Sequence, residues 1–437
     1  MTLHFETRQI HAGQSPDSDT GSRALPIYQT TSYVFESPEQ AADRFALKEL
    51  GPIYTRLNNP TNEVVENRIA DLEGGVGALL VASGQAAEAL AILTIARAGD
   101  NIVASPSLYG GTKNLLTATL PRFGIETRFV PDPDDATSFA ALADDRTVAF
   151  YGETIPNPKG DILDIEAVAT AAHDVGVPLI VDNTLATPYL TRPIEWGADI
   201  VVHSATKYLG GHGTSVAGAI VDAGSFDFGA DPERFPGFTQ PDPSYHGLVY
   251  ARDLGAQSPF GANVSFILKC RLEGQRDLGF AASPFNAFLI SQGLETLSLR
   301  MERHVANAKA VAAFLTEREE VASVAYSSLP DSPYADRARK YCPQGAGAIV
   351  TIDLAGGKEA GRAFISALTL HSHVANLGDV RSLAIHPAST THSQLTDTDL
   401  ANAGIGPGTV RLSVGIEHID DIVADLARGL EAAGAVS

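Results

Sequence analysis

The chain has little of the material that several large classes of protein require. Only two cysteines, Cys270 and Cys342, occur in 437 residues, so a disulfide framework is excluded and a reducing cytoplasm is expected. No stretch approaches the ~18 unbroken apolar residues of a membrane-spanning helix. The polar beginning of the sequence, MTLHFETRQIHAGQ, also lacks the apolar core of a signal peptide. These absences predict a soluble, cytoplasmic, globular protein.

Positive charge is scarce as well. The sequence has 31 Lys and Arg against 52 Asp and Glu, which gives a formal net charge of −21. Binding to nucleic acid or to a membrane surface needs clustered positive charge, so the composition argues against both partners. We interpret the acidity as a source of solubility or as an adaptation to a salt-rich environment, rather than as the sign of a partner.

Several common catalytic motifs are missing too. The sequence has no G-x-G-x-x-G after a predicted strand, no G-x-x-x-x-G-K-[ST], no H-E-x-x-H and no G-x-S-x-G. The spacing closest to a metal site is His371-Ser-His373, which has no nearby cysteine or obvious third ligand. We interpret these two histidines as surface or pocket-wall residues, and no metal is expected.

The residues that are present favour large hydrophobic cores in two or three compact units, since 44% of them are hydrophobic and only 19% charged. Short β-rich runs alternate with Ala-rich helical patterns such as 85–99 and 164–176, each closing on Gly. Runs such as LIVD are apolar without alternation, so both faces of the sheet should be covered by helices. The predicted strands of this largely parallel sheet are 78–82, 101–105, 125–130, 147–152, 178–183, 198–204 and 217–221.

The later part of the chain has a different character. Residues 223–262 are rich in Pro, Gly, Asp and aromatic residues and predict a long ordered loop. A long helical pattern follows at 286–317. The remainder, roughly 318–437, mixes strands with helices at 357–369 and 418–434, which suggests a smaller α+β domain.

Asp182 and Lys207 are the residues most informative about function. Asp182 ends the run LIVD, and Lys207 closes the next run, DIVVHSATK, at a sheet edge where ligands gather. A desolvated lysine can become a nucleophilic amine, and a nearby carboxylate suits a heteroaromatic cation. The pair matches what pyridoxal phosphate (PLP) requires, a Schiff-base lysine and an acid at the pyridine nitrogen. Each residue alone has an ordinary alternative, a turn-forming Asp and a solvated Lys.

A candidate phosphate site accompanies this pair. VASGQAAEAL indicates a strand, a Gly turn and a helix start, where the amides near Gly84 and Gln85 can face an anion. Ser204 and Thr206 could add hydroxyl donors, and the ring of Tyr109 could stack on a cofactor. A simple tight turn at Gly84 and core packing of Tyr109 remain as alternatives.

Several motifs occur in an order that resembles a known family. YTRLNNPTN, ASGQAA, LYGGT, ETIPNPKG, VDNTLATP and HSATKYLGGHG, with RLSVGIE near the end, resemble the Cys/Met-metabolism family of PLP enzymes over nearly the whole chain. The resemblance implies an α/β fold of PLP-dependent transferase fold type I (aspartate-aminotransferase-like). That fold has a mostly parallel seven-stranded sheet and a smaller C-terminal α+β domain. It divides the chain into an N-terminal arm at 1–60 that contacts a neighbouring subunit, a large PLP-binding domain at 61–285 with the insertion 223–262, and a C-terminal domain at 286–437.

The resemblance also implies how the cofactor is held. Lys207 would bind it covalently and shuttle protons, Asp182 would pair with the pyridinium nitrogen, and Asn157 would hydrogen-bond its phenolic oxygen. The residues that would hold the phosphate are Gly84, Gln85, Ser204 and Thr206.

Substrate binding and assembly follow from the same resemblance. Arg411 would bind the substrate α-carboxylate through its planar fork, helped by the backbone around Asn376; without the family context, Arg411 would be interpreted as a surface ion-pair residue. Tyr54 and Arg56 would reach the phosphate in the neighbouring subunit, and Tyr54 would also lie near the substrate. A homotetramer built as a dimer of dimers with shared active sites is expected.

Four details resemble the O-acetylhomoserine sulfhydrylase branch of the family: the segment FPGFTQPDPSYHGL, Gly111, IHPASTTHSQL at 385–395, and Asn376. The branch implies a γ-replacement in methionine biosynthesis, in which O-acetyl-L-homoserine and sulfide give L-homocysteine and acetate. Lys207 and Tyr109 would be catalytic, with Gly111 leaving the wall beside Tyr109 uncrowded. Cystathionine γ-synthase or methionine γ-lyase activity and use of O-succinylhomoserine remain open. So do a nucleotide-sugar aminotransferase and a catalytically silent protein of this fold.

Overall fold

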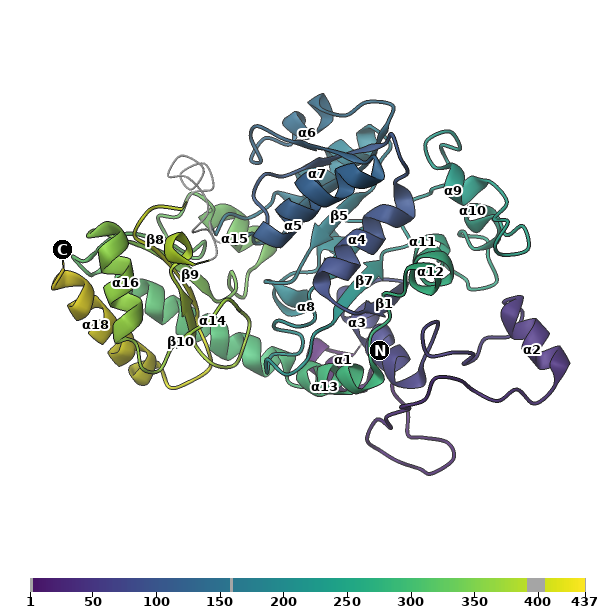
Figure 1. Ribbon diagram of the computed structural model, residues 1–437, viewed down its shortest axis with the longest axis horizontal. Coiled ribbons are helices and arrows are strands. Elements are labelled where there is room, and N and C mark those ends of the chain that lie inside the picture. The colour runs from purple at the N-terminus through teal and green to yellow at the C-terminus, as the bar shows by residue number, and fades with distance from the viewer. Residues whose placement is uncertain (1–2, 158–159, 391–404, 437) are drawn as a thin grey trace.

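The computed structural model describes residues 3–157, 160–390 and 405–436, which form two β-sheets with helices packed around them (Figure 1). The larger sheet has seven strands in the order β1-β7-β6-β5-β4-β2-β3. Strand β7 is antiparallel to both of its neighbours, and the other pairs are parallel. The strands are β1 (Gly77–Val81), β2 (Asn101–Ala104), β3 (Glu126–Phe129), β4 (Thr147–Glu153), β5 (Leu179–Asp182), β6 (Ile200–His203) and β7 (Gly218–Asp222).

Successive residues of these strands enter two separate hydrophobic cores. Leu80 and Val181 pack into one core, while Leu79 and Ile180, each one position away, pack into the other. This division follows from the two-residue period of a strand. Both faces are therefore covered, as the unbroken apolar runs predicted.

Local sequence signals fix where the helices that pack on this sheet begin and end. Asn59 caps α3 through its side chain, Pro60 begins that helix, and Gly74 ends it with φ of 85°. Ser83 caps α4 in the same way. The helices before the second sheet are α1 (Phe5–His11), α2 (Pro38–Phe45), α3 (Pro60–Glu73), α4 (Gly84–Ile95), α5 (Gly110–Asn114), α6 (Thr137–Ala141), α7 (Ile165–Asp174), α8 (Thr187–Leu190), α9 (Pro236–Thr239), α10 (Tyr250–Asp253), α11 (Ser265–Lys269), α12 (Arg276–Leu278), α13 (Pro284–Leu294) and α14 (Leu297–Thr316).

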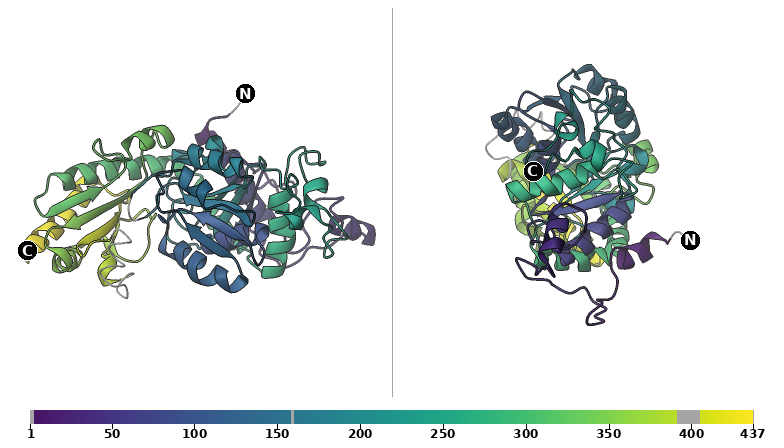
Figure 2. Two further views of the ribbon diagram at one scale, coloured as in Figure 1. Left: turned by 90° about the horizontal axis from the view of Figure 1, so that it is seen from above. Right: turned by 90° about the vertical axis from the view of Figure 1, so that its right-hand side faces the viewer.

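The second sheet has five strands in the order β10-β11-β12-β9-β8. Figure 2 shows this sheet and its helices at one end of an elongated molecule, and the segment that contains α2 at the other. Its strands are β8 (Val321–Ala325), β9 (Ile349–Leu354), β10 (Ser372–His373), β11 (Leu383–Ile385) and β12 (Thr409–Ser413). The helices that follow α14 are α15 (Ala335–Tyr341), α16 (Gly357–Ala367) and α18 (Ile419–Gly434).

The helical pattern predicted over 286–317 is divided between two helices. Two helices, α13 and α14, occupy this stretch, and Thr296 between them has non-helical angles (φ −121°, ψ 16°). Helix α13 is held close to the loop after β6, where a Cβ on Gly293 would lie 2.3 Å from the carbonyl oxygen of Gly210. The buried Arg300 of α14 donates to the carbonyl oxygens of Tyr208 and Gly293. These contacts fix a turn that periodicity did not indicate.

The N-terminal segment, meaning the residues between α1 and α3, extends away from the rest of the chain (Figure 1). Helix α2 has no buried residue, and Val34 and Leu50 are 95% and 68% exposed. Residues 223–262 form a mostly irregular segment that includes α9 and α10, with Phe228, Phe235 and Phe238 packed into a hydrophobic core. This arrangement agrees with the predicted ordered loop.

Other sequence expectations have mixed outcomes. None of the described helices is long and apolar enough to cross a membrane. Cys270 and Cys342 are both buried free thiols. The interpretation of His371 was wrong, because it is 5% exposed and its Nδ1 lies 2.8 Å from Asp425 Oδ2, whereas His373 is exposed. Part of the predicted IHPASTTHSQL motif, residues 391–395, lies outside the described residues.

Candidate active site

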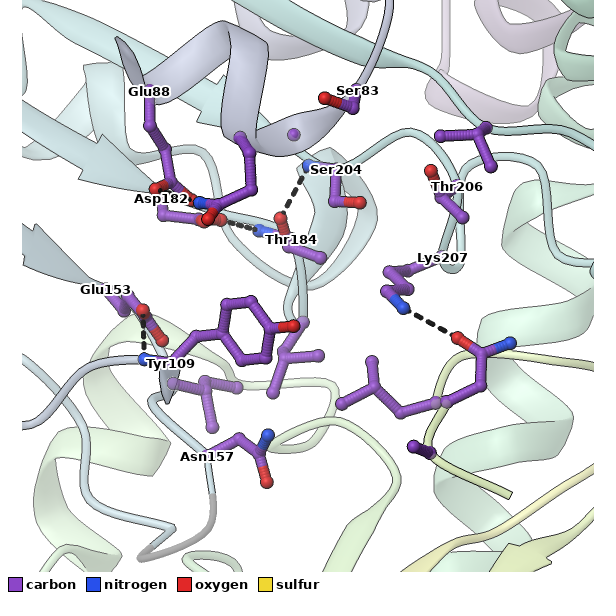
Figure 3. A pocket seen from close by; sticks show the side chains of 18 of the residues that line it. Ser83, Glu88, Tyr109, Glu153, Asn157, Asp182, Thr184, Ser204, Thr206 and Lys207 are labelled. Carbon is purple, nitrogen blue, oxygen red and sulfur yellow. Dashed lines mark hydrogen bonds between the residues drawn. The ribbon is translucent and has the colours of Figure 1, made fainter. Parts of the chain in front are cut away.

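A cavity of about 240 Å³ opens at the carboxyl ends of β4, β5 and β6, where residues of the second sheet face the first (Figure 3). Glu153, Asp182 and the segment after His203 lie at this edge because those strands are parallel neighbours. The cavity brings together most of the predicted site residues. Those that line it are Gly84, Gln85, Tyr109, Asn157, Asp182, Ser204, Thr206, Lys207, Asn376 and Arg411.

One end of the cavity is formed by the N-terminus of α4. The side chain of Ser83 accepts a hydrogen bond from Ala86 N, so the amides of Gly84 and Gln85 remain at the open end of the helix. A Cβ on Gly84 would lie 2.7 Å from Ser204 Cβ, so only glycine allows this close approach. The Thr206 hydroxyl donates to Ala217 O at 3.1 Å and accepts from Ala217 N. The geometry makes a small cradle that can hold an anion.

Asp182 lies at the end of β5 and is 9% exposed. Its Oδ1 accepts a 2.8 Å hydrogen bond from Thr184 N, and Thr184 Oγ1 accepts from Ser204 N at 2.8 Å. These bonds fix the carboxyl group and connect it to the loop after β6. Burial raises the pKa of Asp182, while the hydrogen bonds from Thr184 oppose that rise. A cation placed beside it would favour the ionised form.

Lys207 points into the cavity from the turn after β6, and its Nζ donates to Asn376 Oδ1 at 2.6 Å (Figure 3). Desolvation, and secondarily the positive charge of Arg411, lower the pKa of Lys207 to about 8. An appreciable fraction of the amine is therefore neutral near physiological pH. Neutral amines are the form that attacks aldehydes.

Arg411 lies on β12 of the second sheet and faces Lys207 across the cavity. Its Nη2 donates to Asn376 O at 2.9 Å, and its Nη1 to Asn157 Oδ1 at 3.4 Å. Its Nε is buried without a protein partner among the described residues. A guanidinium held with donor capacity unused is suited to a carboxylate ligand.

Tyr109 stands at the mouth of the cavity with half of its surface exposed. Its backbone N donates to Glu153 Oε1 at 2.6 Å, which fixes the start of α5 (Figure 3). The alternative of core packing is therefore wrong for Tyr109. Its ring is free to contact a ligand in the cavity.

Comparison with known proteins identifies the family. Residues 6–431 match the family of Cys/Met metabolism PLP-dependent enzymes. The chain belongs to this family. The O-acetyl-L-homoserine sulfhydrylases of Leptospira meyeri and Corynebacterium glutamicum are 55% and 53% identical to it, over 98% of this chain and 96% and 97% of their own lengths. The homocysteine synthase of Schizosaccharomyces pombe is 50% identical over 98% of this chain and 99% of its own length.

A solved structure extends this similarity to the fold. The 2.35 Å crystal structure of a Campylobacter jejuni protein assigned as an O-acetylhomoserine (thiol)-lyase has a TM-score of 0.93 and 40% sequence identity. The similarity covers 98% of this chain and 100% of that one, which contains N'-pyridoxyl-lysine-5'-monophosphate at one position. The predicted family, fold class and PLP dependence are confirmed, and the chain is an enzyme of this family.

The cavity fits the family's cofactor by its own chemistry. PLP combines an aldehyde, a protonated ring nitrogen and a phosphate, which need an amine, a carboxylate and an anion cradle. Lys207, Asp182 and the N-terminus of α4 supply these three groups within one cavity. The amine of Lys207, whose pKa is lowered, would gain the cofactor's aldehyde as a partner. The buried carboxyl of Asp182 would gain its ring nitrogen.

Two predicted residues of this PLP enzyme lie elsewhere. Tyr54 and Arg56 are exposed and are absent from the cavity lining. Arg56 donates to Arg276 O, and its guanidinium lies 5.6 Å from the centre of the Tyr54 ring. Within one chain they contribute nothing to the cavity.

Gly111 relieves crowding beside Tyr109, as expected from the sequence. A Cβ on Gly111 would lie 2.5 Å from Tyr109 Cε1 and 2.9 Å from Gln85 Oε1. The absent side chain therefore makes room for these two groups.

Sequence reasoning missed two acidic residues of the site. Glu153 ends β4, so the same rule about strand ends that selected Asp182 could have found it. Glu88 lies on α4 and is 3% exposed. Its spacing of three residues from Gln85 places both on one helix face, but a helical Glu is usually a solvated residue.

Proposed function

We propose that the chain is a PLP-dependent O-acetyl-L-homoserine sulfhydrylase, which converts O-acetyl-L-homoserine and sulfide to L-homocysteine and acetate. The observation that carries this proposal is the agreement among relatives that are 50–55% identical over nearly the whole chain and are named sulfhydrylases or homocysteine synthase. The cavity supports it with an amine, a carboxylate and a guanidinium in one place. We place the reaction in methionine biosynthesis and in the cytoplasm.

The chain's own residues divide the work of holding reactants. The amides of Gly84 and Gln85 and the hydroxyl of Ser204 would hold the cofactor phosphate at the positive end of α4. Asp182 would face the ring nitrogen, and Asn157 would donate to the phenolic oxygen. When bound, the cofactor supplies an electron sink for negative charge at the substrate Cα.

Proton transfers would fall to Lys207 and Tyr109. The neutral amine of Lys207 takes the proton from Cα, which its pKa of about 8 permits near neutral pH. Tyr109, at the mouth, would assist proton transfer near Cγ. There the C–O bond to acetate breaks with its electron pair on oxygen, and sulfide forms the new C–S bond.

Arg411 would orient the substrate by its α-carboxylate. Its guanidinium already holds Asn376 O with one nitrogen and keeps Nε free of protein acceptors among the described residues. A carboxylate could occupy that side with two hydrogen bonds, which fixes both position and direction. Asn376 Oδ1 accepts a hydrogen bond from the amine of Lys207. This hydrogen bond would break when that amine is needed for the reaction.

Assembly would complete the site. Tyr54 and Arg56 lie on the N-terminal segment, which also exposes Val34 and Leu50. Exposed apolar groups on an extended segment favour packing against a second copy of the chain. We place Tyr54 and Arg56 at the neighbour's cofactor phosphate in a homotetramer, with an arm at 1–60, a large domain at 61–285 and a C-terminal domain at 286–437.

A substrate panel tests the proposed activity. The purified enzyme with PLP is offered O-acetyl- or O-succinyl-L-homoserine, each with sulfide, cysteine or methanethiol, and Lys207→Ala serves as the inactive control. We expect homocysteine and acetate in equal amounts from the acetyl donor and sulfide. Faster formation of cystathionine from cysteine, or release of 2-ketobutyrate without a thiol product, would overturn the proposal.

A further inference from the structure

The carboxyl group of Glu88 touches the carboxyl group of Asp182 inside the cavity wall. Glu88 comes from the second turn of α4 and is 3% exposed. A hydrogen bond joins its side chain to that of Asp182, and Figure 3 shows the two groups side by side. Two buried carboxyl groups in contact cannot both be ionised, so one of them carries a proton.

The surroundings decide which of the two carries it. Asp182 accepts from Thr184 N at 2.8 Å and is favoured as an anion by the nearby His203. Glu88 also accepts side-chain hydrogen bonds, from Thr112 and Gln85, but burial and the adjacent Asp182 outweigh them and raise its pKa well above the usual range. Glu153 and Tyr151 from β4 face the same group, and burial raises the pKa of each. Glu88 is therefore the protonated partner, and its hydroxyl donates to Asp182.

Other contacts hold Glu88 in the orientation that this bond requires. Gln85 Nε2 donates to Glu88 Oε2 at 2.7 Å, and Thr112 Oγ1 donates to Oε1 at 3.1 Å. Both oxygens thus accept hydrogen bonds, and the remaining proton can point only toward another acceptor. Asp182 supplies that acceptor.

We propose that Glu88 is a positioning residue, whose hydroxyl fixes the Asp182 carboxylate opposite the cofactor's ring nitrogen and keeps that carboxylate ionised. The inference rests on the role of Asp182 in the proposed function. Glu88 itself would touch neither substrate nor cofactor. Loss of its hydrogen bond leaves Asp182 free to turn and makes it a stronger base, so the ring nitrogen loses positive charge.

The test compares Glu88→Gln, which retains a donor, with Glu88→Met, which has a similar size and no donor. Each PLP-loaded variant is titrated with alkali while the absorbance of the lysine-bound cofactor is followed. We expect Glu88→Gln to titrate as the wild type does, and Glu88→Met to titrate about 1 pH unit higher. The dissociation constant for PLP should rise about tenfold in Glu88→Met alone.

Each other outcome would contradict the inference. Equal shifts in both variants would mean that Glu88 acts as a negative charge, and no shift in either would leave it a purely structural residue. If Glu88→Met does not fold, Thr112→Val loosens Glu88 without removing it, and an unchanged titration in that variant also counts against the proposal.

The Glu88→Met change is also tested in a variant that lacks the Asp182 carboxylate. This experiment distinguishes failure of the inference from failure of the proposed function. In Asp182→Asn, adding Glu88→Met should change neither the titration nor the PLP affinity further, because the group on which Glu88 acts is gone. A further shift would show that Glu88 acts by another route. These readouts need no substrate, so they stand even if the panel of acyl donors and thiols reveals a different reaction.

Discussion

At the scale of single residues, Lys207 combines burial with a cationic neighbour. Desolvation and the charge of Arg411 both disfavour its protonated form. The same environment that lowers its pKa also aims the amine across the cavity, toward Asn376 at 2.6 Å. Reactivity and orientation therefore have one structural cause.

Selective labelling of the cofactor-free protein tests this point. Lys207 is reductively alkylated with a small aldehyde over a range of pH values and its modification is quantified by mass spectrometry. We expect the rate to be half-maximal near pH 8, the value to which its pKa is lowered. Arg411→Met should move that midpoint upward, since it removes the second cause of the shift. Exposed Lys113 monitors the reagent in the same samples, and an Lys207 midpoint at the ordinary lysine pKa of about 10.4 would contradict the expectation.

Sequence reasoning reached the residues whose chemistry follows from their place at a strand end. Asp182 and Lys207 were found because an apolar run marks each strand and ligands collect where such runs stop. Glu88 and the contact of Gly111 with Gln85 were not found. Their roles depend on which side chains lie opposite, across elements far apart in the chain, and periodicity carries no such information.

At the scale of elements, Asp425 connects α18 to the edge of the second sheet. Its Oδ1 accepts from Thr369 N at 2.8 Å and Arg428 Nη2 at 2.6 Å, and its Oδ2 accepts from His371 N at 2.9 Å. Burial opposes ionisation of Asp425, but these hydrogen bonds outweigh it and hold its pKa below the usual range. The contribution of Asp425 to stability is therefore full above the unfolded carboxyl pKa of about 3.9 and is lost as the pH falls toward the folded value.

Removing this carboxylate should weaken the second sheet. We expect Asp425→Ala to lower the free energy of unfolding at neutral pH by about 3 kcal/mol, because it leaves several buried donors unpaired. Urea denaturation measures the loss, and hydrogen exchange should increase first in residues 369–373. Glu431→Ala, an exposed change on the same helix, should stay within about 0.5 kcal/mol of the wild type. Equal stability of Asp425→Ala and this control would refute the argument.

The strands could be predicted from the sequence more accurately than the helix boundaries. All seven predicted strands of the large sheet exist within a residue or two of the expected bounds, since their apolar runs reflect burial on both faces. The break between α13 and α14 was missed because Glu295 and Thr296 are not helix breakers. The break is set by tight contact of Gly293 with the loop after β6 and by Arg300, which are tertiary effects.

At the scale of the whole molecule, mixed oligomers test the shared site. In the proposed assembly, a working site combines Lys207 of one subunit with Arg56 of its neighbour. We expect Lys207→Ala and Arg56→Ala chains, each inactive alone, to regain about a quarter of wild-type activity when co-expressed in equal amounts, because random pairing restores one site in four. If both residues served the same chain's site, mixing would restore nothing. Analytical ultracentrifugation of the mixture confirms that the subunits assemble.

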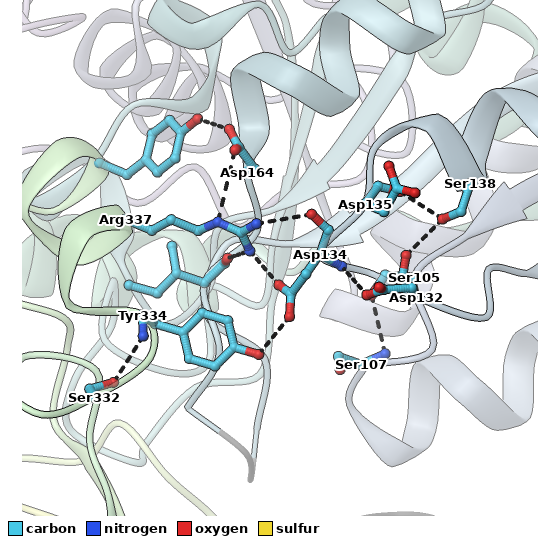
Figure 4. A network of polar contacts seen from close by, with 12 residues as sticks. Ser105, Ser107, Asp132, Asp134, Asp135, Ser138, Asp164, Ser332, Tyr334 and Arg337 are labelled. Carbon is cyan, nitrogen blue, oxygen red and sulfur yellow. Dashed lines mark hydrogen bonds and ion pairs between the residues drawn. The ribbon is translucent and has the colours of Figure 1, made fainter.

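The two sheets are joined by a polar network away from the cavity (Figure 4). Arg337 of α15 pairs with Asp134, which follows β3, and its Nε lies 3.8 Å from Asp164, which precedes α7. Tyr334 Oη donates to the same Asp134 at 3.0 Å. The second sheet is thus attached to the first at a point beyond the reactive groups.

The groups that would hold the cofactor and the group that would hold the substrate lie on different sheets. The groups matched to the cofactor's phosphate, ring nitrogen and aldehyde all belong to the first sheet and its loops, whereas Arg411 belongs to the second. A substrate held by Arg411 would therefore rest on the second sheet, while the cofactor would rest on the first. Release of the product would then leave the groups that hold the cofactor unchanged, so one bound cofactor could serve successive substrate molecules.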